Sequence, residues 1–159
     1  MLKQCLLVVV LFFCVQVESQ NIADNEEIEG NSISAQLYTK CFDNLNQGLD
    51  ILEKYPTFKD VKLCSIAYCM MLLYYKDEEI KRVAEQRLRG IATQLFQEGN
   101  PVYLISGMDS YLTAQEKNKN LEDDNHIVYI SIAACLTLSF EAKAQEIVNE
   151  QTMQLINRK

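Results

Sequence analysis

The chain has 159 residues, of which 48% are hydrophobic, and its 22 acidic and 15 basic side chains give a formal net charge of −7 at pH 7. This acidic balance argues against a nucleic-acid ligand and against adhesion to an anionic membrane, because both need a surface rich in Lys and Arg. The length is that of one ordinary domain.

Residues 1–19 have the features of a signal peptide. Lys3 supplies a positive start, 5–15 is an unbroken apolar run, and Val17 and Ser19 give the small-residue spacing of a cleavage site. The alternative is a membrane anchor, but the apolar run is shorter than the ~20 residues of a spanning helix. We therefore expect a secreted, extracellular protein with no membrane anchor.

The next segment, 20–31, is predicted to be a flexible acidic tail, because it has little apolar content and carries Asp24, Glu26, Glu27 and Glu29. The remaining residues, 32–159, are predicted to form a single helical domain.

Two helices are predicted in the first part of this domain. Apolar side chains recur at helical spacing from Ile33 to Leu52, and Pro56 interrupts the pattern. A capping-box pattern that begins at Thr57 predicts a second helix running through Tyr74. This second helix is apolar nearly all round, so we expect a central position for it.

A third helix is predicted after Asp77, a good N-cap residue. Gly99 ends this helix, and Pro101 is well placed as the first residue of a fourth. The apolar stripe of the third helix is Ile80, Val83, Ala84, Leu88, Ile91 and Leu95. The fourth helix carries Leu104, Ile105, Met108, Tyr111 and Leu112.

The last part of the chain allows two interpretations. The segment 127–132 is rich in β-branched residues and is typical of a buried strand. A lone strand would have no partner elsewhere in the chain, and the Ala-rich continuation 133–145 is typical of a helix. We therefore predict a helix here, and expect the tail 141–156 to pack back on the others. The predicted fold class is all-α, a disulfide-linked bundle of about five or six helices.

An internal duplication is a further hypothesis. The segment 65–74 and the segment 131–140 share Ser, Ile, Ala, Cys and Leu at a spacing of 66 positions. This match predicts two pseudo-symmetric helical hairpins, 33–98 and 99–159, with the two related helices packed together. The alternative is a chance match between helices built from few residue types.

Four of the six cysteines remain once the leader is removed, which is typical of two disulfides in a secreted chain. Because Cys64 and Cys69 are predicted on one helix, the rise of ~1.5 Å per residue places their Cα atoms too far apart for a bridge. Hairpin geometry then favours Cys41 with Cys69 and Cys64 with Cys135. The alternative is Cys41 with Cys64 and Cys69 with Cys135.

The sequence contains no recognisable catalytic or metal site. His126 is the one histidine, and no Gly-rich nucleophile turn accompanies it. The acids Glu122, Asp123 and Asp124 beside it lack the central Gly of a calcium-binding loop. Zinc would need ligands that the disulfides have already taken. We expect no enzyme activity, no cofactor and no metal.

Tyrosine and methionine side chains could line a cavity for a small hydrophobic ligand, although filling the core is the favoured interpretation. These residues are Tyr68, Met70, Met71, Tyr74, Tyr75, Tyr103, Met108, Tyr111 and Tyr129.

Two functions fit these observations: an interaction protein that binds an extracellular protein, and a carrier of small hydrophobic ligands. The cysteine spacing disfavours the second, since odorant-binding carriers have six cysteines with three residues between the second and third, whereas Cys64 and Cys69 enclose four. With its leader, its helical domain and the four cysteines Cys41, Cys64, Cys69 and Cys135, the chain resembles small helical salivary proteins of blood-feeding insects, the anophensin-type inhibitors of complement and contact activation. The resemblance implies a non-enzymatic effector that binds a host immune or haemostatic protein, and it assigns no site residue.

Overall fold

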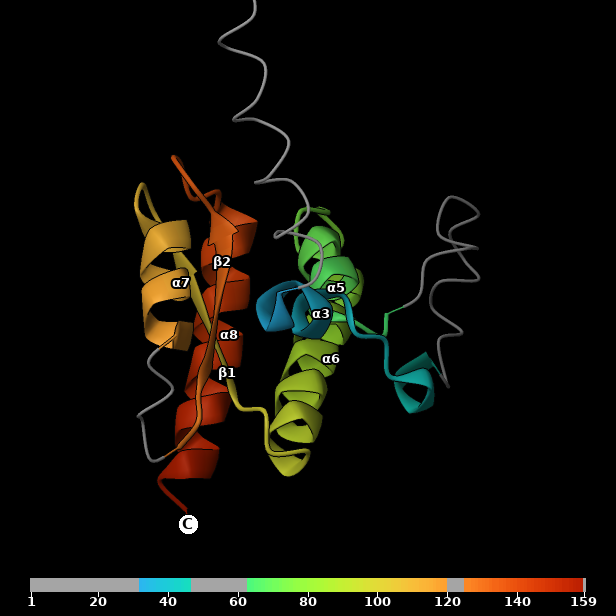
Figure 1. Cartoon of the computed structure of the whole chain (residues 1–159). Coiled ribbons are helices and arrows are strands. Elements are labelled where there is room, and N and C mark those ends of the chain that lie inside the picture. Colours follow the sequence, from blue (N-terminus) through green and yellow to red (C-terminus); the bar gives the residue numbers. More distant parts are fainter. Residues whose placement is uncertain (1–31, 47–62, 120–124, 159) are drawn as a thin grey trace, which may run out of the picture. The chain divides into compact units, whose positions relative to one another are not determined.

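A computed structural model of the chain describes residues 32–46, 63–119 and 125–158. The predicted leader and acidic tail lie outside these ranges. Residues Ile33–Lys159 group as one compact unit. The described residues form, in chain order, α3 (Ile33–Thr39), the 3-10 helix η1 (Asp43–Asn46), α5 (Ile66–Leu72), α6 (Glu78–Gln97), β1 (Val102–Ser106), α7 (Ser110–Lys119), β2 (Val128–Ala133) and α8 (Ser139–Ile156) (Figure 1).

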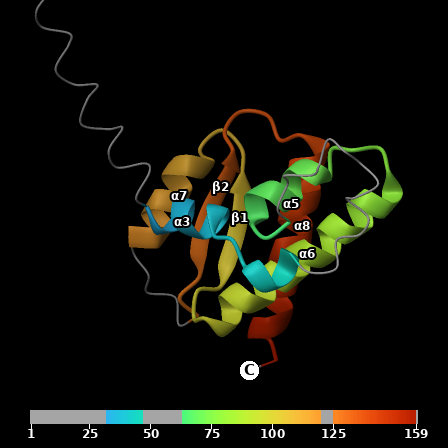
Figure 2. The same ribbon diagram turned by 90° about the vertical axis from the view of Figure 1, so that its right-hand side faces the viewer.

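The fold is mostly helical but is not all-α, which corrects the predicted fold class. Strands β1 and β2 run parallel and pair with each other, with Val102 opposite Val128 and Leu104 opposite Ile130. Helix α7 lies between them in the chain, so that β1, α7 and β2 form a β-α-β unit (Figure 2). Five α-helices lie within the described ranges, close to the five or six that the sequence predicts.

Both strands replace predicted helix. The β-branched segment around Ile130 is a strand, as its composition suggested, and its partner is β1. Pro101 does not begin a helix. Its carbonyl accepts a hydrogen bond from Val128 N–H at 2.8 Å, which starts the strand pairing. The connecting helix α7 begins only at Ser110, after a turn at Gly107.

One face of the sheet belongs to the core. Val102, Leu104, Val128 and Ile130 are buried and lie in one apolar cluster with side chains of α5, α6 and α8. The opposite face carries Ser131, whose hydroxyl is 2.6 Å from that of Ser110 on α7. The alternation of buried and partly buried residues along each strand therefore places α7 on the other face from the core helices.

Helix α6 agrees with its sequence pattern. Asp77 is its N-cap, and its carboxylate accepts hydrogen bonds from Glu79 N–H at 2.9 Å and Ile80 N–H at 3.2 Å. Gly99 follows the helix with φ of 79°, a conformation that favours glycine. Of the six residues of the predicted stripe, Val83 is partly buried and packs against the core. The other five are fully buried: Ile80, Ala84, Leu88, Ile91 and Leu95.

The first two predicted helices are shorter than expected. α3 ends at Thr39, and the chain turns before η1. α5 begins only after Ser65, whose hydroxyl accepts a hydrogen bond from Tyr68 N–H at 3.3 Å. The predicted start of this helix at Thr57 lies outside the described residues.

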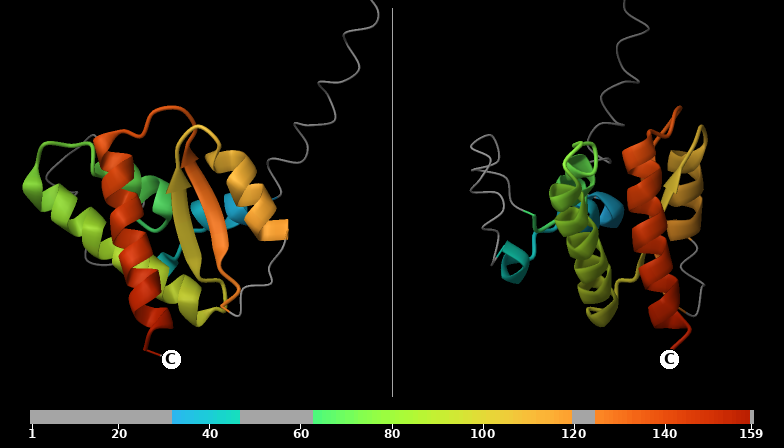
Figure 3. Two further views of the ribbon diagram at one scale, coloured as in Figure 1. Left: turned by 90° about the vertical axis from the view of Figure 1, so that its left-hand side faces the viewer. Right: turned by 180° about the vertical axis from the view of Figure 1, so that it is seen from behind.

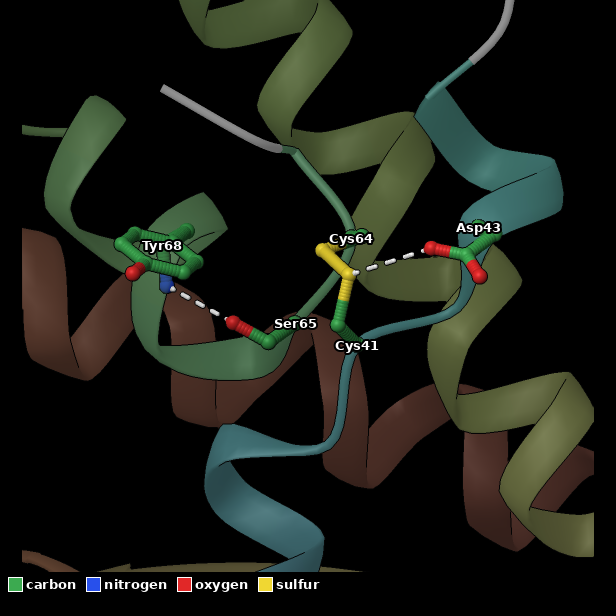
Figure 4. The surroundings of a disulfide bond; sticks show 5 residues. All are labelled: Cys41, Asp43, Cys64, Ser65 and Tyr68. Carbon is green, nitrogen blue, oxygen red and sulfur yellow. Dashed lines mark hydrogen bonds between the residues drawn. A yellow bond between two sulfur atoms is a disulfide. The ribbon is translucent and has the colours of Figure 1, made fainter. Parts of the chain in front are cut away.

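The disulfide joins Cys41 to Cys64, with Cα atoms 4.6 Å apart (Figure 4). The favoured pairing of Cys41 with Cys69 and Cys64 with Cys135 is therefore wrong. Cys64 lies in the turn before α5 and not on that helix, so it faces Cys41, and Phe42 N–H donates to its carbonyl at 2.9 Å. The first bond of the alternative pairing is present. Its second is absent, because Cys69 is a buried free thiol and Cys135 an exposed one.

The two repeated segments have different structures. Ser65 caps a helix, whereas Ser131 lies within strand β2. Cys69 is in the middle of α5, but Cys135 lies in the connection between β2 and α8. The expected pair of equivalent, packed helices does not form, so the predicted two-hairpin architecture is wrong.

The described part of the chain holds no helix whose length and hydropathy would suit a membrane span.

Candidate binding surfaces

His126 takes part in no metal-binding cluster among the described residues. It is exposed, in the turn before β2, with φ of 51°. Glu122, Asp123 and Asp124 lie outside the described residues. Within the described ranges, no cluster of three or more His, Cys, Asp or Glu side chains is arranged to hold a metal ion.

The tyrosines and methionines considered as cavity-lining or core residues are mostly on the surface. Of the nine, only Met70 belongs to the buried core. Tyr103 and Tyr129 are partly buried on the sheet, with ring centroids 5.7 Å apart. The other six are exposed: Tyr68, Met71, Tyr74, Tyr75, Met108 and Tyr111. Neither the cavity nor the core interpretation describes these six.

Four of them form what we call the tyrosine patch: Tyr68, Met71, Tyr74 and Tyr75. Tyr68 and Met71 lie one turn apart on α5, whereas Tyr74 and Tyr75 lie in the turn that follows this helix. Tyr74 and Met71 have 74% and 58% of their surface exposed. A hydrophobic segment for which the sequence predicts a central position therefore presents four large side chains to solvent.

The local backbone determines the exposure of the tyrosine patch. Met70 and Leu72 of α5 point into the core and anchor the helix. After Leu72 the chain tightens, since Tyr74 N–H donates to Met71 O at 3.3 Å and Tyr75 N–H to Leu72 O at 3.2 Å. The i to i−3 spacing of these bonds is that of a 3-10 turn.

Tyr74 also contacts the start of α8. Its ring packs edge-on against Phe140, with centroids 5.8 Å apart and an interplanar angle of 79°. This arrangement is a favourable aromatic geometry. The patch is thereby held against a second element.

A second candidate surface is an open groove of about 660 Å³ beside β1, which we call the β1–α8 groove. Its lining includes Tyr103, Ser106, Gln145, Glu146, Glu150 and Met153. Helix α8 (red) runs alongside β1 (yellow) in Figure 3. Because the side chains of α8 that line the groove recur at i, i+3 and i+4, they share one face of the helix.

Three polar side chains along this groove, those of Ser106, Gln145 and Asn149, form hydrogen bonds within the protein. The buried side chain of Asn149 pairs with both backbone groups of Leu104, at 2.7 and 2.9 Å. Ser106 donates its hydroxyl hydrogen to Gln145 Oε1 at 2.7 Å. At the rim of the groove, the side chains of Glu146 and Glu150 are about half exposed.

A smaller hollow of about 320 Å³ lies at the turn between β1 and α7, where Met108, Asp109 and Thr113 line it. It is open to solvent, like the β1–α8 groove. Neither hollow encloses a volume as ligand pockets for small apolar molecules do.

Cys69 and Cys135, the free thiols of the described residues, differ in burial. Burial raises the pKa of Cys69 from 9.0 to about 12, although the charge of Arg87 opposes the change. A thiol with so high a pKa carries almost no thiolate at neutral pH and is a poor nucleophile. Cys135 is exposed, between β2 and α8.

A comparison of the chain with models of known protein families, with curated proteins and with solved structures finds no match.

Proposed function

We propose that the chain is a secreted, non-enzymatic protein that binds and modulates an extracellular protein, with the tyrosine patch as its contact surface. The observation that carries the proposal is the exposure of Tyr68 and Met71 on a short, anchored helix and of Tyr74 and Tyr75 in the turn directly after it. Exposed single apolar residues are ordinary, but a contiguous group of large ones is typical of a binding surface. Tyrosine and methionine are enriched in protein interfaces, and tyrosine is frequent among the residues that dominate binding energy.

The disulfide supports the extracellular part of the proposal. A bond between Cys41 and Cys64 persists in oxidising compartments and is rare in the cytosol. Together with the leader-like residues 1–19, it favours export. The resemblance to salivary effectors suggests an immune or haemostatic protein as the target.

The carrier alternative has less support. Six of the nine residues considered as ligand-enclosing, among them Tyr68 and Tyr74, are exposed, and the hollows at β1 are open. A carrier would need to bury most of the ligand surface.

Photo-crosslinking tests the proposed contact surface. A photoreactive methionine analogue at position 71 should crosslink to one discrete protein in plasma or haemolymph. Tyr68→Ser should weaken this crosslink while leaving the folded structure intact, because the Tyr68 side chain is half exposed. The matched control carries the photoreactive residue at position 116, on the exposed side of α7. Equal crosslinking from both positions, or none from position 71, contradicts the proposal.

Export has its own test. Expression of the full chain in a secreting cell line should yield protein in the medium that begins at Gln20. Protein retained in the cells with its original N-terminus contradicts this part of the proposal.

A further inference from the structure

We infer that the β1–α8 groove binds a basic, arginine-containing segment of a partner protein. The groove shares no lining residue with the tyrosine patch, so the inference does not depend on the function proposed above.

The charge of the groove selects the ligand class. Glu146 and Glu150 are the charged side chains among its lining residues, and they stand one helical turn apart on α8. Both are about half exposed. Their partners within the chain are weakly held: Glu146 pairs with the exposed Lys143 at 3.0 Å, and Glu150 lies 4.0 Å from Arg89. Such surface pairs contribute little stability and are readily exchanged for another cation.

The raised pKa of the neighbouring Lys143 indicates that the carboxylates around it stabilise positive charge. Its pKa is raised above the ordinary value, mainly by its hydrogen bond to Glu146 and further by the charges of Glu146, Glu85 and Glu150. Three carboxylates therefore act on one ammonium group. Arg89 is the second basic side chain in this group, which leaves an excess of negative charge for an incoming cation.

The apolar lining favours arginine within the basic class. Tyr103 and Met153 are both partly open to solvent on the groove. The contact of Tyr103 with Tyr129 orients its ring. A guanidinium group can stack on such a ring while it pairs with a carboxylate through two hydrogen bonds, and its aliphatic stem can cover the methionine. An ammonium group lacks the planar shape for this combination.

The openness of the groove favours a segment of protein chain over a small cation. A small ligand needs to be largely enclosed to bind well, whereas a peptide can contribute several side chains along an open groove. The backbone of Leu104 at the edge of β1 is already bound by Asn149, so the peptide cannot extend the sheet at that residue. Recognition at Leu104 must therefore come from side chains.

Fluorescence anisotropy with labelled hexa-arginine, hexalysine and hexaglutamate peptides tests the inference on the whole protein. Hexa-arginine should bind more tightly than hexalysine, and hexaglutamate should not bind. The double variant Glu146→Gln/Glu150→Gln should weaken hexa-arginine binding at least tenfold. Lys143→Met should strengthen it several-fold, because it removes the internal competitor.

Matched controls separate the groove from general attraction to an acidic protein. Asp109→Asn/Glu116→Gln makes the same change in charge on the β1–α7 turn and α7, and should alter affinity less than twofold. Lys119→Met on α7 matches Lys143→Met in the same way. Equal losses in the two double variants, or no binding of hexa-arginine, overturn the inference. Amide chemical-shift changes on adding hexa-arginine should centre on Tyr103 and Glu150, and a centre on any other surface also overturns it.

Discussion

The side-chain amide of Asn149 takes the place of a third strand beside Leu104. Leu104 N–H donates to Asn149 Oδ1 at 2.7 Å, and Asn149 Nδ2 donates to Leu104 O at 2.9 Å. Asn118 does the same on the outer edge of β2, where Tyr129 N–H donates to its Oδ1 and its Nδ2 donates to Tyr129 O, both at 2.8 Å. Each strand of this two-stranded sheet thus has one residue, Leu104 or Tyr129, whose outer-edge backbone groups are paired by an asparagine side chain.

Asn149→Ala should lower the free energy of unfolding by about 2–6 kcal/mol, because it leaves two buried backbone groups of Leu104 without partners at about 1–3 kcal/mol each. Urea denaturation followed by circular dichroism measures the change. Asn157→Ala, at an exposed helix end, is the control and should change stability by less than about 0.5 kcal/mol. Equal effects of the two substitutions would show that the paired amide contributes nothing.

Cys41→Ser/Cys64→Ser should lower the free energy of unfolding by about 3 kcal/mol. The bond joins positions separated by 23 residues, and the loss of such a crosslink increases the entropy of the unfolded chain. The comparison is made by urea denaturation without reductant. Cys135→Ser, at an exposed free thiol, should have no effect of this size. A fall in stability in the Cys135 variant that matches the double variant would mean that the pairing is different.

Cys69 should make stability depend on pH in the alkaline range. Its thiol titrates near 9.0 when unfolded and near 12 when folded, so the folded state holds the proton more tightly. The contribution is fully present below pH 9 and is lost as pH rises toward 12, by at most about 1.4 kcal/mol per pH unit. Denaturation of the protein and of Cys69→Ala between pH 8 and 10.5 should show a difference that shrinks with rising pH. A constant difference contradicts this.

Site-resolved alkylation gives an independent measurement of the same burial. Iodoacetamide at pH 8 should label Cys135 in the native protein within minutes and Cys69 only after denaturation. Mass spectrometry of the tryptic peptides distinguishes the two sites. Rapid native labelling of Cys69 would show that α5 opens readily.

Thr152→Val should leave stability unchanged or raise it by up to about 1 kcal/mol. Thr152 is fully buried, and its hydroxyl finds no hydrogen-bond partner among the described residues. Valine has nearly the same shape and removes an unpaired polar group. Thr93→Val on α6 is the matched control and should destabilise, because that hydroxyl donates to Arg89 O at 2.9 Å and accepts from Gln151. Destabilisation by both substitutions would indicate a partner for Thr152.

The part of the fold that the sequence predicts best is α6. Its N-cap Asp77, its apolar stripe and its terminating Gly99 all lie within one continuous segment, so local rules suffice. The two strands are not predicted, because local rules do not suffice for them. The segment beginning at Val102 has apolar residues that satisfy both helical and alternating spacing, and short runs of this kind do not distinguish the two. Its partner β2 lies some 26 positions later, beyond the reach of any local pattern.

The binding surfaces depend on burial, which a hydrophobic segment alone does not reveal. Met70 and Met71 are adjacent and of the same type, yet one lies in the core and the other on the surface. The β1–α8 groove unites Tyr103 with Glu146, which only the unpredicted sheet brings together. Similarly, the pairing of Cys41 with Cys64 depends on where α5 begins, and helix boundaries are the least certain feature of a sequence-based prediction.

The crosslink between Cys41 and Cys64 also determines the product of proteolysis between these two cysteines. Lys54, Lys59 and Lys62 lie between the two cysteines, so a cut after any of them opens the polypeptide without releasing a fragment. The nicked molecule gains only the mass of one water, and its two pieces separate only in the presence of a reductant.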